Sequence, residues 1–119
     1  MSLKISTLNK DGDQNEEYIV LVATADVDIN NYAIVDRTFT TTGLSNVHRH
    51  FFRFPSKNIK KDEYVILKTG KGEADKYENK NNQIIHRFYW GSDAPFWNDS
   101  QTEKAELLKI QTIDTKLVK

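Results

Sequence analysis

The sequence is 119 residues long, which is enough for a single domain with one hydrophobic core. It contains no cysteine, and this excludes a disulfide framework as well as thiolate-based zinc, redox or nucleophilic chemistry. Seventeen basic and seventeen acidic side chains leave no net charge to attract DNA or an anionic membrane. Binding of either kind would therefore require a local patch.

The sequence begins MSLKIS and has no apolar run long enough for a signal peptide. Its longest uninterrupted apolar runs are four to six residues, so we expect no membrane insertion. With this N-terminus the protein is expected in the cytoplasm, whereas a native signal that had been removed would make it a secreted protein. We expect residues 1–14 to form a flexible lead and residues 15–119 to form the folded domain.

Period-two alternation predicts strands in most of the chain. In chain order they cover residues 18–23, 29–35, 50–54, 64–67, 84–90, 105–110 and 113–118. Residues 71–83 are polar and rich in asparagine, which predicts an exposed loop. A helix over residues 102–110 is the one competing interpretation, because these residues have good helix propensity. About seven short strands separated by turn signals predict an all-β sandwich or barrel.

Both tryptophans lie in the stretch FYWGSDAPFWNDS at residues 88–100. Most aromatic side chains are buried, which favours a strand end and a loop folded over one mouth of a sandwich. The alternative is an exposed aromatic platform for a sugar or a base. The predicted core residues are Tyr18, Tyr32, Ile34, Phe52, Phe54, Trp90 and Trp97.

Four motifs in order resemble the lamin tail domain family, an immunoglobulin-like module also found in many bacterial proteins. They are EYIVL at 17–21, VDINNYAIVD at 27–36, FRFP at 52–55, and the WG and WN pairs at 90–91 and 97–98. The sequence departs from the family pattern at Asn31-Tyr32, at Asp62-Glu63, and over residues 102–107. The resemblance covers roughly residues 15–119 and implies an antiparallel Greek-key β-sandwich of about seven to nine strands. It also implies a non-enzymatic interaction or targeting module that binds a protein partner.

The stretch HRHFFRFP at residues 48–55 places His48, His50, Phe52 and Phe54 on one face of a strand. Arg49, Phe51 and Arg53 lie on the other face. If the resemblance holds, the phenylalanines at 52 and 54 point into the core and Arg53 points out. We favour this interpretation, in which the strand has basic, solvated ends.

The second interpretation is a surface that binds single-stranded nucleic acid or carbohydrate. It would gather the basic residues Arg37, His48, Arg49, His50, Arg53 and Arg87, with Phe51 or Tyr89 available for stacking. A third interpretation, a metal site, would need His86 or a carboxylate to join His48 and His50. We predict no metal and no cofactor, and expect His86 to be a satisfied or half-exposed strand residue.

No catalytic pattern stands out. Gly70-Lys71-Gly72 lacks the spacing of a phosphate-binding loop, and Ser92 is not in a nucleophile elbow. We therefore predict that the protein is not an enzyme. An exposed edge strand would also allow two copies to pair as a homodimer.

Overall fold

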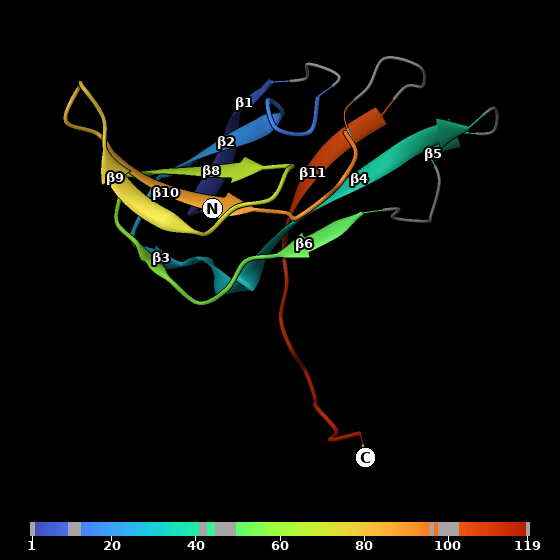
Figure 1. Cartoon of the computed structure of the whole chain (residues 1–119). Helices are drawn as coiled ribbons and strands as arrows, with labels where there is room; N and C mark the ends of the chain where they lie inside the picture. The colour runs from blue at the N-terminus through green and yellow to red at the C-terminus, as the bar shows by residue number, and fades with distance from the viewer. Residues whose placement is uncertain are drawn as a thin grey trace.

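Alternating burial along the strands gives each sheet an inner and an outer face. In β2 (Tyr18–Ala23) every second side chain is buried, beginning with Ile19, and β8 (Tyr64–Lys68) repeats the pattern from Val65. The computed structural model describes residues 2–9, 13–40, 43–44, 50–95, 97 and 103–118, and arranges them as packed sheets (Figure 1). The predicted all-β sandwich is confirmed.

The larger sheet has five strands in the order β1-β2-β8-β10-β9. Its other members are β1 (Leu3–Asn9), β9 (Asp75–Glu78) and β10 (Ile84–Tyr89). Neighbours run antiparallel except β8 and β10, which are parallel. A parallel pair needs a return connection, and β9 provides it by pairing with the far edge of β10.

The second sheet is built on β4 (Tyr32–Thr40), which pairs with β11 (Glu103–Lys109) on one side. On its other side β4 pairs with β5 (Gly43–Leu44) and β6 (Phe51–Arg53). A third, two-stranded sheet joins β3 (Val27–Asp28) to β7 (Asn58–Ile59). The 3-10 turn η1 (Ile29–Asn31) connects β3 to β4, and the Asp28 side chain caps it by accepting from the Asn30 N–H at 3.0 Å.

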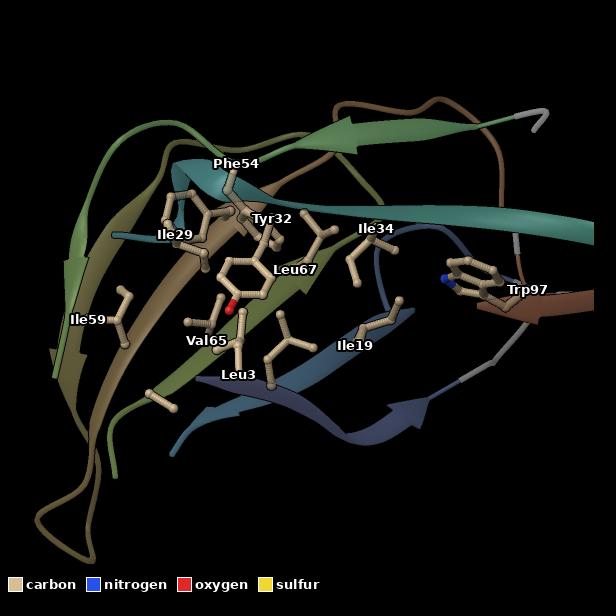
Figure 2. Close-up of a cluster of buried hydrophobic side chains, with 13 residues drawn as sticks. Leu3, Ile19, Ile29, Tyr32, Ile34, Phe54, Ile59, Val65, Leu67 and Trp97 are labelled. Carbon is tan, nitrogen blue, oxygen red and sulfur yellow. The ribbon is translucent and has the colours of Figure 1, made fainter. Parts of the chain in front are cut away.

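Aromatic rings join the two main sheets across the core. The ring of Phe54 lies 5.3 Å from that of Phe88, and the ring of Phe52 lies 5.7 Å from that of Trp90. Phe52 lies in β6 and Phe54 directly follows it, while Phe88 lies in β10 and Trp90 directly follows that strand. The inner faces of these two strands therefore pack against each other. Figure 2 shows the aliphatic and aromatic side chains gathered between the strands.

Most of the predicted core is confirmed. Tyr32, Ile34, Phe54 and Trp97 are buried, and Phe52 and Trp90 are partly buried against the same cluster. Tyr18 is the exception. Ile19 and Leu21 lie on the inner face of β2, so Tyr18 lies on its outer face and is half-buried. The strand alternation that makes a core also decides which aromatic residues are left outside.

Three local predictions differ from the structure. The lead is not flexible over Leu3–Asn9, which pairs with β2 as β1, with Leu3 buried. The predicted exposed loop at residues 71–83 contains β9. The strand predicted at residues 113–118 has no paired strand, and its side chains are exposed. In each case the decisive factor is pairing with a distant segment, which the local pattern does not contain. The strand predicted at residues 105–110 is confirmed as part of β11 (Glu103–Lys109), and the competing helix is not formed in the described part of residues 102–110.

Within the described part of the chain, no helix is long and apolar enough to cross a membrane.

We expect Trp97→Ala to lower the free energy of unfolding by about 3–5 kcal/mol, because the side chain is buried against the core and its removal leaves a cavity. Such a loss is a large share of a typical total of about 5–15 kcal/mol. Urea unfolding followed by circular dichroism measures it. Phe51→Ala is the matched control, with an expected loss of about 1 kcal/mol, because 52% of Phe51 is exposed. Equal losses in the two variants would contradict the burial of Trp97.

Candidate binding surface

The six predicted binding residues do not form one described surface. His48 and Arg49 lie outside the described residues, as does the side chain of Arg37, whose backbone belongs to β4. His50, Arg53 and Arg87 are described, and each has a different environment.

Arg53 and Arg87 point away from each other. Arg53 alternates with Phe52 and Phe54, whose rings face the other sheet, and Arg87 alternates with Phe88 in the same way. The two guanidinium groups are therefore on the opposite outer faces of the sandwich. No single row containing both arginines is formed.

Arg53 connects two segments of the chain. Its Nε donates to the carbonyl of Asn30 at 2.9 Å, and a terminal nitrogen donates to Asn30 Oδ1 at 3.3 Å. The other terminal nitrogen donates to the Thr112 hydroxyl at 3.3 Å. These contacts tie β6 to η1 and to the segment after β11, so part of the hydrogen-bonding capacity of Arg53 is used within the fold.

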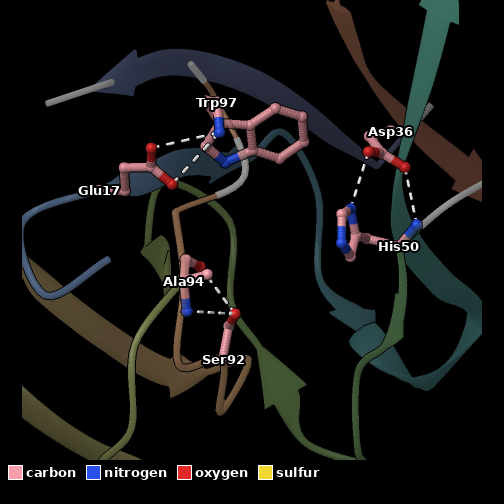
Figure 3. A network of polar contacts seen from close by, with 6 residues as sticks. All are labelled: Glu17, Asp36, His50, Ser92, Ala94 and Trp97. Carbon is pink, nitrogen blue, oxygen red and sulfur yellow. Dashed lines mark hydrogen bonds and ion pairs between the residues drawn. The ribbon is translucent and has the colours of Figure 1, made fainter. Parts of the chain in front are cut away.

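His50 is held by a fully buried carboxylate. Asp36 Oδ1 accepts the His50 backbone N–H at 2.7 Å, and Asp36 Oδ2 lies 2.8 Å from the ring Nδ1 (Figure 3). The His50 ring meets Trp90 edge-on, with centroids 6.4 Å apart. The ring of His50 is thus positioned by Asp36 at Nδ1 and by its contact with Trp90.

A second buried carboxylate lies beyond the tryptophans. The rings of Trp90 and Trp97 are 6.3 Å apart, and both carboxylate oxygens of Glu17 accept the Trp97 backbone N–H, at 3.2 and 3.3 Å (Figure 3). Glu17 and Trp97 are 80 positions apart in the sequence. This bond holds the backbone of Trp97 against the start of β2.

The described residues around His50 and Trp97 offer few groups that could take part in a chemical reaction. A buried carboxylate that orients a histidine ring is one part of an acid–base site, but such a site also needs a reacting group within reach. Ser92 Oγ is instead engaged with Ala94, donating to its carbonyl at 2.7 Å. Among the residues the structure describes, no group of three or more histidine, cysteine, aspartate or glutamate side chains could hold a metal ion.

Arg87 lies in an exposed cluster with three partners. Its Nε and one terminal nitrogen donate to the two carboxylate oxygens of Asp75, at 2.9 and 2.6 Å. The guanidinium carbon lies 4.9 Å from the ring centre of Tyr77 and 5.8 Å from that of Tyr89. The Asp75 hydrogen bond raises the pKa of Arg87 above its ordinary value. We call these four residues the Arg87 surface.

The sheet register explains why these side chains meet. Arg87 is paired with Asp75 across β9 and β10, and Tyr77 is paired with Ile85 two positions along. Arg87, Asp75 and Tyr77 therefore lie on the outer face, together with Tyr89. The ring of Tyr89 in turn lies over Gly72, where an added Cβ would be 2.5 Å from ring atoms. Glycine at this position lets the preceding loop approach the ring closely.

Sequence reasoning missed Asp75 and Tyr77, because the segment around them was predicted to be a loop. The signal that could have located them is the two-residue spacing of Asp75 and Tyr77 next to the strand at residues 84–90. It also missed Asp36 and Glu17, whose roles depend on contacts with His50 and Trp97 far along the chain.

His86 was predicted to be a satisfied or half-exposed strand residue, but it is buried in β10 and only one of its ring nitrogens is bonded. Its Nε2 lies 2.9 Å from Glu63 Oε1, whereas Nδ1 has no hydrogen-bond partner among the described residues. Burial alone would raise the pKa of Glu63, but hydrogen bonds from the Lys60 N–H and from His86 bring it below its usual value.

No family model and no curated protein matches this chain.

We expect Asp36→Ala to cost about 1–3 kcal/mol of unfolding free energy, because it leaves the His50 N–H without its acceptor. Asp36→Asn should cost less, since an amide oxygen can still accept that hydrogen. Asp93→Ala, in an exposed ion pair with Lys71, is the control and should change little. Chemical denaturation measures all three. Equal losses for Asp36→Ala and Asp36→Asn would show that the hydrogen bond to the backbone is not what matters.

Glu63 should make stability depend on pH in the acid range. Because its folded pKa is lower than that of the unfolded chain, its contribution is present at neutral pH and is lost as the pH falls through the folded pKa. We therefore expect Glu63→Gln to flatten the decline of unfolding free energy on acidification, whereas exposed Glu73→Gln should not. Denaturation curves at a series of pH values measure this. Parallel declines in wild type and Glu63→Gln would contradict it.

Proposed function

We propose that this protein is a non-enzymatic interaction module of the lamin tail type, which binds a protein partner through the Arg87 surface. The observation that carries the proposal is the arrangement of Arg87, which donates from two of its three guanidinium nitrogens to Asp75 and is flanked by two tyrosine rings.

The chemistry of this surface suits a protein partner. Tyrosine and arginine are over-represented among residues that dominate the energy of protein interfaces. Arg87 is already fixed by Asp75, so little side-chain entropy would be lost when a partner covers it. Tyr77 is 37% exposed, and half-buried Tyr64 and Ile66 of β8 extend the outer face beside Arg87.

The local charge favours protein over nucleic acid. Asp75 compensates the charge of Arg87, and the chain as a whole has no net positive charge. Phosphate binding needs unpaired positive groups that release counterions. A carboxylate in the centre of the surface would repel a phosphate backbone.

The lamin tail part of the proposal rests on the four ordered motifs and on their positions in an all-β sandwich. The FRFP motif supplies Phe52 and Phe54 to the core, and the tryptophans of the last motif contact each other. A module of this kind would act by positioning the molecules to which it binds.

The first test is to capture the partner at the surface itself. A photo-crosslinking amino acid placed at Tyr77 should join the protein to specific partners in cells, and mass spectrometry identifies them. The same group at exposed Phe51, on the other sheet, is the matched control. Identical products at both positions would contradict a binding role for this surface.

We expect Arg87→Ala and Tyr77→Ala each to weaken binding of the captured partner by about 2 kcal/mol, or roughly 30-fold, as at interface hot spots. Phe51→Ala should not weaken it, and all three variants should keep the wild-type circular dichroism spectrum. Calorimetric titration of the purified partner measures the affinities. In parallel, fluorescence anisotropy with short DNA and RNA should remain flat. Tight oligonucleotide binding with a steep salt dependence would favour the nucleic-acid interpretation instead.

A further inference from the structure

The segment after β11 pairs with no strand in the described structure, and its one described contact with the sandwich beyond Ile110 is the hydrogen bond from Arg53 to the Thr112 hydroxyl. The ladder between β11 and β4 continues to Ile110, whose N–H donates to the Asn31 carbonyl at 2.8 Å. It stops there because Asn31 belongs to η1 and no strand continues beside it. We call residues 111–118 the C-terminal tail, and Figure 1 shows it leaving both sheets.

The tail carries large apolar side chains into water. Ile113 is 93% exposed, Leu117 82% and Val118 92%. Along an extended strand, Ile113, Thr115 and Leu117 share one face, and Asp114 and Lys116 lie on the other. This is the pattern of a half-buried strand, which is why the sequence predicts one here. The described sandwich does not provide its partner.

The order of residues in the tail is self-complementary about Thr115. When two tails run antiparallel with Thr115 opposite Thr115, Asp114 of one copy faces Lys116 of the other, and Ile113 faces Leu117. Opposite charges and aliphatic pairs both stabilise an antiparallel pair, and like charges destabilise it. A register centred on Asp114 or on Lys116 would place like charges opposite each other. The Thr115 register is therefore favoured over both.

We propose that the C-terminal tail pairs with the tail of a second copy of this chain, in an antiparallel ribbon whose two-fold axis passes through Thr115. The commitment to a second copy follows from the symmetry, since in a two-fold contact residue i meets j and j meets i. The paired tails place Ile113 and Leu117 of both copies side by side on one face, where they shield one another from water. The inference concerns a different segment from the Arg87 surface and does not depend on it.

The assembly state of the full chain is the first measurement. Sedimentation equilibrium should give a mass that tends to twice 13.8 kDa as concentration rises. A mass of one chain at every concentration would overturn the proposal.

Charge exchange then tests the register. Asp114→Lys and Lys116→Asp should each reduce the mass to that of one chain, because each places like charges opposite each other twice. Mixing the two single variants should restore the dimer, since every pair in the mixed ribbon is again opposite in charge. The double variant should also dimerise. Single variants that stay dimeric, or a mixture that stays monomeric, would overturn the proposal.

The charge variants should leave the fold itself unchanged, because both side chains are exposed in the tail. Circular dichroism of each monomeric variant checks this. A variant that loses its β spectrum would be replaced by Asp114→Asn or Lys116→Gln, which should weaken association without creating repulsion.

Cross-linking provides an independent test. Across a two-fold axis the two Thr115 Cα atoms would lie about 4.5–5.5 Å apart, within the range that a disulfide spans. The chain has no cysteine, so Thr115→Cys introduces a single thiol. Mild oxidation should convert this variant to a covalent dimer, and Thr112→Cys, which would face Val118, should cross-link many-fold more slowly. Equal rates would overturn the register.

Discussion

The packing of β6 on β10 is the contact on which the arrangement of the surfaces depends. Phe52 and Phe54 meet Trp90 and Phe88 between the sheets, and this fixes which face of each strand is turned to solvent. Because side chains alternate along a strand, Arg53 and Arg87 are forced outward on opposite sides. The basic residues are thus separated by the same aromatic contacts that make the core.

Two buried carboxylates, those of Glu17 and Asp36, bind backbone N–H groups near the two tryptophans. Burying a charge is costly unless hydrogen bonds compensate it, and both groups accept backbone N–H groups from distant segments. Glu17 binds the Trp97 N–H and Asp36 binds the His50 N–H. Each bond holds a backbone N–H of a distant segment, so the two carboxylates position Trp97 and His50.

The sequence predicted the features that depend on local alternation. Tyr32, Ile34 and Phe54 were expected in the core because apolar residues recur at every second position, and they are buried. The roles of Asp75 and Tyr77 were not predicted, because β9 is a strand only through its pairing with β10, and their two-residue spacing within a polar segment is a weak signal on its own. The Glu17–Trp97 bond was equally out of reach, since local patterns carry no information on which distant atoms meet.

Charge is balanced locally as well as overall. Arg87 is paired with Asp75, His86 lies against Glu63, and the tail places Asp114 two positions from Lys116. Such pairs produce little field at a distance, so they do not attract a charged partner by long-range steering. Under the two proposals made above, recognition would depend on contact: on the fit of the tyrosine rings around Arg87, and on the order of residues along the tail. Both features distinguish one protein surface from another, and neither would collect polyanions in general.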